Sequence, residues 1–332
     1  MEKKLIILTN SFDGVNSQSV IDNINLLSDC EVFRFDVDKL KLGSLVLNLL
    51  INDSREDIRI NNAVGQTCTM DQIGSAWYRR PNYFGPTKIN EESTVDKSIN
   101  REILAVQDSI IDKIPIKTWL NDPSEMRKIN SKIAQLELAK DIGFKIPDTI
   151  ISNDVAIFRE FLEEHRQIII KPLKEFMYYE NGEYKSLFST IISVENFSDY
   201  DLIKNSPVLL QDYIHKQFEY RVTVVENNIY PVKIFSNGIS NDDWRKHQFS
   251  NNIEFKTAEN IEPELNNKCL EFLSRCNLKY GVFDIIKNKE DELVFLEMNS
   301  NGQWYWLENL LGIPVSQSIA KSLIAIFNDN AR

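Results

Sequence analysis

The chain has no long apolar run. Its first ten residues, MEKKLIILTN, contain only four consecutive apolar residues and therefore predict a first strand rather than a signal peptide. No stretch approaches the roughly 18 consecutive apolar residues that a membrane-spanning helix needs. The 332 residues suffice for a large core, as two domains or as one enzyme with several lobes. We therefore expect a globular protein without a membrane partner.

Residues that bind zinc or form disulfides are few. The four cysteines lack metal-ligand spacing: Cys30, Cys68, Cys269 and Cys276. Cys269 and Cys276 are seven residues apart, which places them on one face of a helix, and we expect both to pack as small hydrophobic side chains. The three histidines are scattered, which argues against zinc: His165, His215 and His247. This composition predicts a cytoplasmic protein.

Basic residues are fewer than acidic residues. The chain has 38 lysines and arginines against 49 aspartates and glutamates, which gives a net charge of −11. Because nucleic acid is itself a polyanion, this balance argues against it as the main partner. The sequence contains neither internal repeats nor low-complexity segments.

Two apolar runs near the C-terminus predict a hairpin that carries acids. LVFLEMN reads as a strand on which Glu297 and Asn299 share one face, and the preceding run YGVFDII contains Asp284. A four-residue loop over 289–292 would place Asp284 opposite Glu297. Two carboxylates and an amide oxygen suit Mg²⁺, which often accompanies nucleotide phosphates. The alternative is a polar hairpin end with three solvated side chains.

The remaining pattern predicts an α/β protein, with a domain boundary marked by Pro115 and by Asp122-Pro123. Strands over 3–8 and 30–36 flank a helix near 19–27, which is typical of a small α/β lobe. Further helices are expected over 91–113, 123–142, 154–166, 262–277 and 316–326. Further strands are expected over 167–173 and 207–215, with hairpin turns at Asn181-Gly182 and Asn227-Asn228.

Several weaker signals follow one another in order. Lys132 lies in a helix ahead of GFKIPDT, and Lys171 ends the apolar strand QIIIK. Two lysines can neutralise phosphates, and the strand end LLQDYI can offer backbone groups to an adenine edge. The segment WYRRP places Arg79 and Arg80 at a strand end, where one side chain is expected to enter a cleft and the other to pair at the surface. The alternative for this pair is two solvated arginines.

This order resembles the ATP-grasp superfamily of carboxylate–amine ligases. WYRRP, DWR and EMNSNGQWYW more narrowly resemble the ATP-grasp ligases that cyclise ribosomal peptides, the microviridin-type or graspetide maturases. The resemblance covers roughly Ile73 to Ala320. It implies an ATP-grasp fold with an N-terminal α/β lobe over 1–115, a central lobe over 116–206 and a C-terminal ATP-binding lobe over 207–332. It departs from the wider family at Ser300, where proline is frequent, and in having one glycine, Gly182, within residues 171–192.

The resemblance also implies roles for individual residues. The phosphates of ATP would contact Lys132 and Lys171, the adenine hinge would comprise Gln211, Asp212, Tyr213 and Ile214, and Glu219 would lie near the ribose. Two Mg²⁺ ions would be held by Asp284, Glu297 and Asn299. The transferred phosphoryl group and the substrate carboxylate would face Arg221 and Arg245, because an arginine fork grips such groups with two hydrogen bonds.

The implied activity is ATP-dependent crosslinking of a precursor peptide. An Asp or Glu side chain would be activated as an acyl phosphate and then attacked by Ser or Thr, giving an ester, or by Lys, giving an amide. One alternative is a ligase that adds amino acids to a peptide or protein terminus, and another is a nucleotide-binding module without chemistry. A homodimer is expected.

An acidic protein must recognise an acidic core peptide through another part of the precursor, and the family resemblance implies that this part is an N-terminal leader. The predicted docking surface is the hairpin at Asn181-Gly182 with the short helix expected after it, within residues 193–206. Its aromatic and acidic residues are Phe176, Tyr178, Tyr184, Glu195 and Asp199. These side chains suit a leader helix with apolar and basic residues. The alternative is that the tyrosines cover the ATP cleft.

Overall fold

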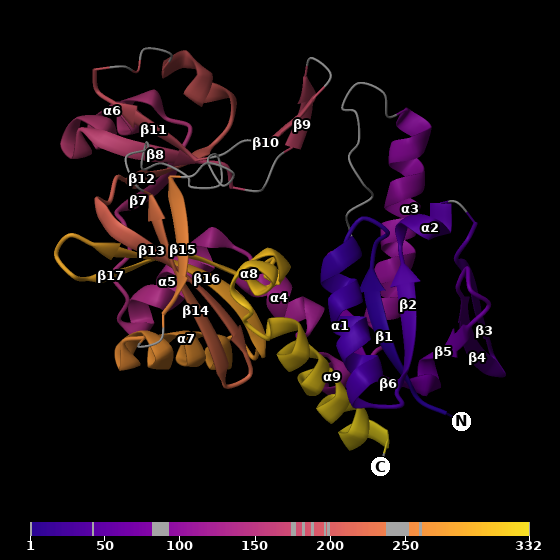
Figure 1. The fold of residues 1–332 in the computed structure, drawn as a ribbon. Coiled ribbons are helices and arrows are strands. Elements are labelled where there is room, and N and C mark those ends of the chain that lie inside the picture. The colour runs from indigo at the N-terminus through magenta and orange to yellow at the C-terminus, as the bar shows by residue number, and fades with distance from the viewer. Residues whose placement is uncertain are drawn as a thin grey trace.

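The computed structural model describes residues 2–41, 43–81, 93–173, 177–180, 183–186, 189–195, 197, 200–236, 252–258 and 261–331. An N-terminal lobe stands beside a larger C-terminal part, and the last helix crosses back to the N-terminal lobe, so that both chain ends lie at its base (Figure 1). Within the described ranges, no helix has the length and apolar character to cross a bilayer.

A parallel three-stranded sheet forms the centre of the N-terminal lobe. Its order is β2 (Glu31–Asp36), β1 (Lys4–Thr9) and β6 (Ile73–Tyr78), and every side chain of β1 is buried. The helix between the first two strands, α1 (Gly14–Leu27), begins five residues earlier than expected. A second helix, α3 (Thr94–Ile111), covers the sheet and begins at an N-cap, Ser93, that accepts from the Asp96 amide. The predicted small α/β lobe is confirmed.

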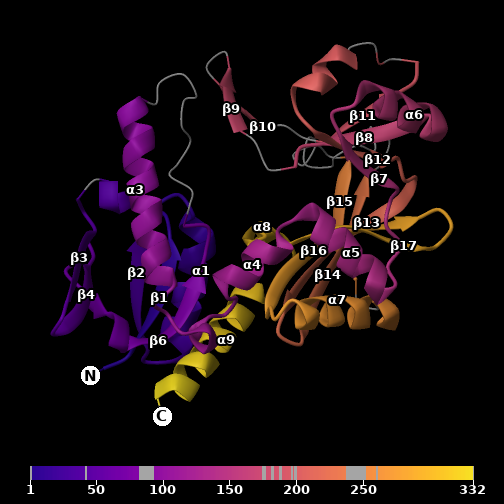
Figure 2. The same cartoon turned by 180° about the vertical axis from the view of Figure 1, so that it is seen from behind.

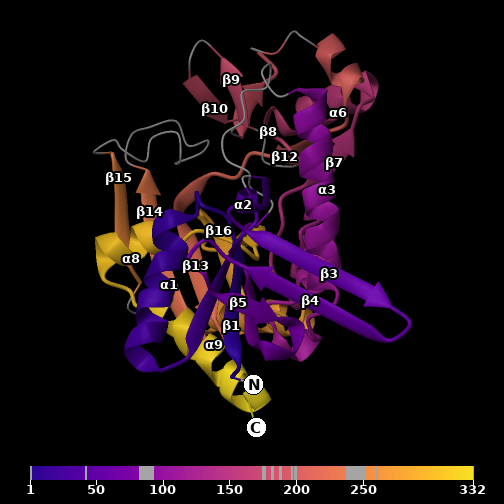
Figure 3. The ribbon, with the colours of Figure 1, turned by 90° about the vertical axis from the view of Figure 1, so that its right-hand side faces the viewer.

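A second sheet in this lobe was not expected from the sequence. It is antiparallel, with the order β3 (Val46–Asn52), β4 (Arg55–Asn61) and β5 (Thr67–Thr69), and projects from the lobe in Figure 3. Short helical turns flank it, α2 (Asp38–Lys41) and η1 (Met70–Gln72). β3 is an edge strand with exposed apolar side chains.

The helix predicted over 123–142 is two helices, α4 (Pro123–Ile129) and α5 (Lys132–Ile142). The single-helix prediction is wrong because Ser131 is an N-cap that accepts from the Ala134 amide and begins a new helix. Gly143 ends α5 with φ of 91°, as the sequence predicted. A 3₁₀ turn, η2 (Ile116–Thr118), precedes the pair.

The central sheet is antiparallel, with the order β11 (Thr190–Ser193), β8 (Gln167–Lys171), β12 (Val208–Asp212) and β7 (Thr149–Ser152). Helix α6 (Val155–His165) and the turn η3 (Tyr200–Asn205) pack on it through a separate apolar core. The predicted hairpin is formed by β9 (Met177–Glu180) and β10 (Glu183–Ser186), although its turn, Asn181-Gly182, lies outside the described residues. β12 lies beyond the predicted boundary at residue 206 and is nonetheless paired within this sheet.

The C-terminal sheet carries the predicted hairpin. Its order is β15 (Ile253–Thr257), β14 (Asn228–Ser236), β13 (Lys216–Val225), β16 (Tyr280–Asn288) and β17 (Leu293–Asn299), all antiparallel. Figure 2 shows α4, α5 and α7 (Pro263–Arg275) on one face of this sheet, where they enclose the largest core. The turn between β13 and β14 is Glu226-Asn227, one residue earlier than predicted, because Glu226 adopts the left-handed φ of 54°.

The last two helices join the lobes. α8 (Tyr305–Leu311) leads into α9 (Val315–Ala331), which packs against α1 and β6. One apolar core therefore contains side chains from both ends of the chain, including Leu5, Trp77, Trp304 and Leu323. Cys269 and Cys276 are buried in the C-terminal core, as predicted, and burial raises the pKa of the Cys276 thiol to about 11.

Candidate functional site

The register of the C-terminal hairpin brings two acids together. Asp284 on β16 pairs directly with Glu297 on β17, as predicted. The pairs nearest the loop are shifted by one residue from the expected register, because Lys287 rather than Asn288 pairs with Leu293. A bulge at Leu296 then brings Asp284 opposite Glu297. Phe295 and Met298 both enter the core, so the bulge turns Glu297 to the opposite face. The hairpin loop is Lys289 to Glu292, as predicted.

Two cations neutralise the paired carboxylates. Arg221 Nη1 donates to both oxygens of Asp284, at 2.9 and 3.1 Å, and Lys132 Nζ donates to Glu297 Oε2 at 2.8 Å. Arg221 Nη2 also donates to the carbonyl oxygen of Gln303 at 3.1 Å. Four predicted site residues, from α5, β13, β16 and β17, thus meet in one half-buried cluster. Such charge-assisted contacts hold both carboxylates in a fixed orientation.

This donor set fits Mg²⁺. Carboxylate and amide oxygens are hard ligands, and two adjacent carboxylates with one exposed amide leave room for the waters and phosphate oxygens that Mg²⁺ keeps. Asn299 is exposed at the end of β17, and its Oδ1 accepts from the Asn301 amide at 2.9 Å. The described residues contain no cluster of three or more His, Cys, Asp or Glu side chains suited to a metal. A metal held here would therefore depend on Asn299 and on the nucleotide for further ligands.

Buried amide side chains fix the backbone of the hairpin. Gln135 on α5 accepts from the Met298 amide at 2.9 Å and donates to the Met298 carbonyl oxygen at 2.8 Å. Asn121 accepts from the Lys279 and Tyr280 amides and donates to the Tyr280 carbonyl oxygen. Both amides replace missing strand neighbours, so the two strands that bear the acids are held at the end of the hairpin away from its loop. Sequence analysis missed both residues.

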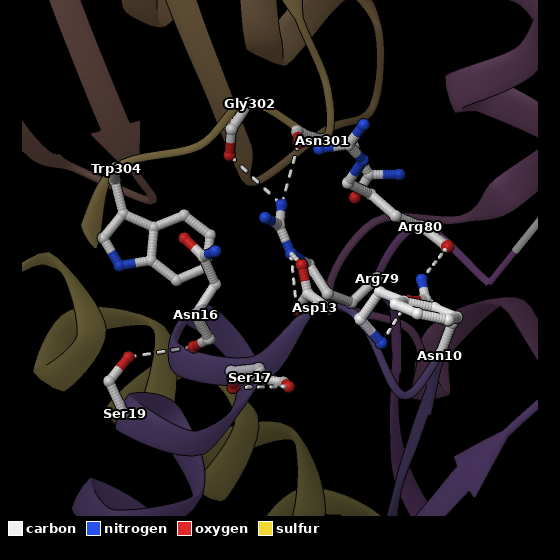
Figure 4. Close-up of polar contacts among 12 residues, drawn as sticks. Asn10, Asp13, Asn16, Ser17, Ser19, Arg79, Arg80, Asn301, Gly302 and Trp304 are labelled. Carbon is white, nitrogen blue, oxygen red and sulfur yellow. Dashed lines mark hydrogen bonds and ion pairs between the residues drawn. The ribbon is translucent and has the colours of Figure 1, made fainter. Parts of the chain in front are cut away.

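The turn after β17 is also anchored. Arg79 is fully buried and donates to carbonyl oxygens of this turn, as Figure 4 shows. The prediction for WYRRP is therefore corrected, because Arg79 neither opens into a cleft nor pairs at the surface. Arg80 is half-buried, and its carbonyl oxygen accepts from Asn10 at 2.7 Å. Gly302 packs so closely on Val282 that a Cβ would lie 2.5 Å from its Cγ2 atom, which requires glycine there.

The predicted nucleotide residues lie on two sheets. Lys171 ends β8, and Gln211 and Asp212 end the neighbouring strand β12. Tyr213 and Ile214 follow as half-buried residues, and the Tyr213 amide donates to the Gln167 carbonyl oxygen at 3.1 Å. The Gln211 side chain is buried and donates to Thr149 Oγ1 at 3.0 Å.

Glu219 lies two residues before Arg221 on β13, so both side chains share one face of the strand. Glu219 is buried and forms an ion pair with Lys216, which is also buried. The contact with the ribose that the family resemblance implies for Glu219 stays a prediction.

Asp212, in the segment predicted to bind adenine, has a shifted pKa. Desolvation, together with the nearby Asp148 carboxylate, raises the pKa of Asp212 above its ordinary value. Between the ordinary and the raised value, folded Asp212 keeps a proton that the unfolded chain loses, so folding stability falls as pH rises through that window. We expect Asp212→Asn to unfold at a higher temperature than wild type at pH 7, with the difference vanishing below about pH 4, measured by thermal denaturation. An equal difference at both pH values would show that charge is not the cause.

Part of the predicted site lies outside the described residues, namely Arg245, Phe176 and Asp199, together with the side chains of Tyr178 and Tyr184. Glu195 is described, and it accepts from Arg166 Nη2 at 2.7 Å on the exposed surface.

Comparison with known proteins supports the ATP-grasp family that the sequence resembles. The profile of the MvdD pre-ATP grasp domain matches residues 4–127. No curated protein sequence is similar enough to count as a relative. Among solved structures, the macrocyclase MdnC of Microcystis aeruginosa MRC, bound with precursor peptide MdnA, is 24% identical with a TM-score of 0.82, covering 97% of this chain and 99% of that one. At this identity it supports the fold alone.

A second solved structure is more similar. It is a RiPP-associated ATP-grasp ligase of Chryseobacterium gregarium in complex with ADP and a leader and core peptide. The identity is 30%, the TM-score is 0.85, and the match covers 98% of this chain and 97% of that one. The hairpin geometry and this match over nearly the whole of both chains show that the protein belongs to the RiPP-associated ATP-grasp ligases, the family that its motifs predicted.

Proposed function

We propose that the protein crosslinks a ribosomal precursor peptide at the expense of ATP. An Asp or Glu carboxylate of the peptide attacks the γ-phosphorus, and ADP leaves. A Ser or Thr hydroxyl, or a Lys amine, then attacks the acyl carbon of the acyl phosphate. Phosphate leaves, the nucleophile loses its proton, and an ester or amide closes the ring. The observation that carries the proposal is the pairing of Asp284 with Glu297 between Arg221 and Lys132.

Asp284, Glu297 and Asn299 would hold Mg²⁺, and the number of oxygen ligands on this face suits two ions. The metal would supply positive charge that offsets the charge developing on the transferred phosphoryl group. Arg221 and Lys132 keep the two carboxylates separated and aligned, which lowers the reorganisation needed for metal binding. Two solved ligases of this fold agree with the expected cofactors: one is in complex with ADP, and the other is complexed with Mg and ADP.

The nucleotide would lie between the central and C-terminal sheets. Lys132 and Lys171 would contact its phosphates, and Glu219 the ribose. The backbone of Gln211 to Ile214 is the better candidate for the adenine edge, because the Gln211 side chain is buried and bonded to Thr149. Arg221 and Arg245 would face the phosphoryl group and the substrate carboxylate, and the Arg221 guanidinium is also bonded to Asp284.

The leader of the precursor would dock on the β9–β10 hairpin and the segment after it. Its predicted contacts are Phe176, Tyr178, Tyr184, Glu195 and Asp199. Glu195 pairs with Arg166 at an exposed site, and exposed pairs of this kind are weak, so a basic leader side chain can replace Arg166. The relative from Chryseobacterium gregarium was solved with a leader and core peptide.

We also propose a homodimer that forms through β3. This edge strand, VLNLLIN, carries no charge, and its exposed apolar side chains are Val46, Leu49, Leu50 and Ile51. Its outer backbone groups can pair with the same strand of a second copy, and an uncharged strand avoids the repulsion expected between two chains of net charge −11.

Ile51→Lys tests the dimer. Ile51 is 62% exposed on β3, and a lysine there should split the dimer into monomers in light scattering at micromolar concentration, because charge blocks strand pairing. Val64→Lys is the matched control, since Val64 is 79% exposed in the β4–β5 loop. A monomeric wild type, or an I51K protein that remains dimeric, would contradict the assignment.

Heavy-oxygen labelling tests the chemistry. When the peptide carboxylates carry the label, an acyl phosphate mechanism transfers one labelled oxygen into phosphate for each crosslink. Unlabelled phosphate would contradict the proposal. A ligase that adds amino acids would raise the mass of the peptide, whereas crosslinking lowers it, and a module without chemistry would release no ADP.

A further inference from the structure

A buried guanidinium links the N-terminal lobe to the turn after β17. Arg79 follows β6, and its Nε donates to both oxygens of Asp13 at 3.2 Å. Its Nη1 donates to the carbonyl oxygens of Asn301 and Gly302, at 2.8 and 3.2 Å (Figure 4). Arg79 is fully buried, and the side chain of Asp13 is 2% exposed. One side chain therefore bonds to residues more than 200 positions away in sequence.

The turn of Asn301 to Gln303 has all three of its carbonyl oxygens bound. Besides Arg79, the Tyr280 hydroxyl donates to the Gly302 oxygen at 2.6 Å, and Arg221 donates to the Gln303 oxygen at 3.1 Å. The same Arg221 holds Asp284. The turn is therefore bonded to the N-terminal lobe on one side and to the acid cluster on the other.

The position of this turn sets the direction of the Asn299 amide. The Asn301 backbone amide donates to Asn299 Oδ1 at 2.9 Å, so a shift of Asn301 moves the oxygen that would bind the metal. The turn cannot relax toward β16, because Gly302 already lies against Val282. The Arg79 guanidinium carbon lies 4.7 Å from the Trp304 ring centroid, and this contact confines the turn on its other side.

We infer that Arg79 is a positioning residue for the metal site: it fixes the turn that orients Asn299 and thereby sets the affinity of the site for Mg²⁺. The inference rests on the proposed function for the metal. Arginine is required because its planar fork can bond a carboxylate and two carbonyl oxygens at once, whereas the compact ammonium of lysine cannot span them.

Arg79→Lys tests the inference, with Arg34→Lys as the matched control. Arg34 also donates to a carboxylate, Asp36, and to a carbonyl oxygen, that of Asn10, at the end of the same sheet, and neither belongs to the turn. The measurement is the calorimetric affinity for Mg²⁺ of each protein saturated with ADP. We expect R79K to bind Mg²⁺ about tenfold more weakly, as for other residues that orient metal ligands, and R34K to bind as wild type. ADP affinity in chelator should be equal in all three proteins.

Mg²⁺ affinity of R79K within twofold of wild type would overturn the inference, and so would equal losses in R79K and R34K. If R79K fails to fold, Asp13→Asn replaces it, because loss of the acid weakens the anchor of Arg79 while the guanidinium remains. D13N should then weaken Mg²⁺ binding by a smaller factor, and unchanged binding would contradict the inference. A wild type that binds Mg²⁺ and ADP but crosslinks no precursor would contradict the proposed function alone.

Discussion

Glu297→Gln should abolish crosslinking and ADP formation while the fold persists. Glu297 pairs with Asp284 and receives a hydrogen bond from Lys132, so the glutamine removes the charge without a change of shape. Loss of one preorganised electrostatic contact commonly lowers a rate by on the order of 10²–10³, and loss of a proposed metal ligand should cost at least as much. The measurement is ADP release with precursor, ATP and Mg²⁺.

Glu292→Gln is the control on the same hairpin. Glu292 pairs with Lys145 at 2.9 Å on the surface of the loop, away from the acid cluster. This variant should retain close to wild-type turnover, because an exposed pair contributes little. An E297Q protein that keeps more than about a tenth of wild-type turnover would show that the metal site is elsewhere.

Arg221→Ala should lose crosslinking and retain nucleotide binding. Arg221 bonds Asp284 and the Gln303 carbonyl oxygen, and in the proposed mechanism it faces the phosphoryl group and the substrate acid, not the adenine. Removal of an interaction of this kind is expected to lower the rate of crosslinking about 100-fold or more. Melting temperature should fall as well, because Asp284 loses its partner. Rate and ADP affinity are measured on the same preparation.

Arg275→Ala gives the reference for loss of an arginine at the surface. Arg275, at the end of α7, forms long ion pairs with Asp141 and Glu271, at 3.6 and 3.8 Å, and its removal should change neither the crosslinking rate nor the ADP affinity. If ADP affinity of R221A falls as far as its crosslinking rate, Arg221 anchors the nucleotide and does not act on the substrate.

The hairpin could be predicted because its signals are local. The strand pattern and loop length determine which residues face each other, and Asp284 and Glu297 follow from them. The bulge at Leu296 could not be predicted, since it depends on both Phe295 and Met298 finding space in the core. The prediction of the pair therefore held although two details of the register differed.

Other features depend on contacts that no local pattern encodes. Gln135 and Asn121 bond backbone groups 163 and 159 positions away, and an isolated amide in a helix or loop gives no indication of this. Arg79 did carry a signal, as one of two adjacent arginines at a strand end, but its burial against Asp13 and Trp304 depends on how the lobes pack. The β3 to β5 sheet escaped prediction because β3 is apolar on both faces and exposed, without the alternation of a half-buried strand.

We propose that the enzyme forms crosslinks by ATP-dependent loss of water from a precursor peptide. The most direct measurement is the intact mass of the precursor after incubation with enzyme, ATP and Mg²⁺, with the ADP released counted in the same reaction. The mass of the precursor should fall by one water for each ADP formed, and E297Q should leave that mass unchanged. A precursor of unchanged or increased mass, from a folded enzyme that consumes ATP, would contradict this proposal.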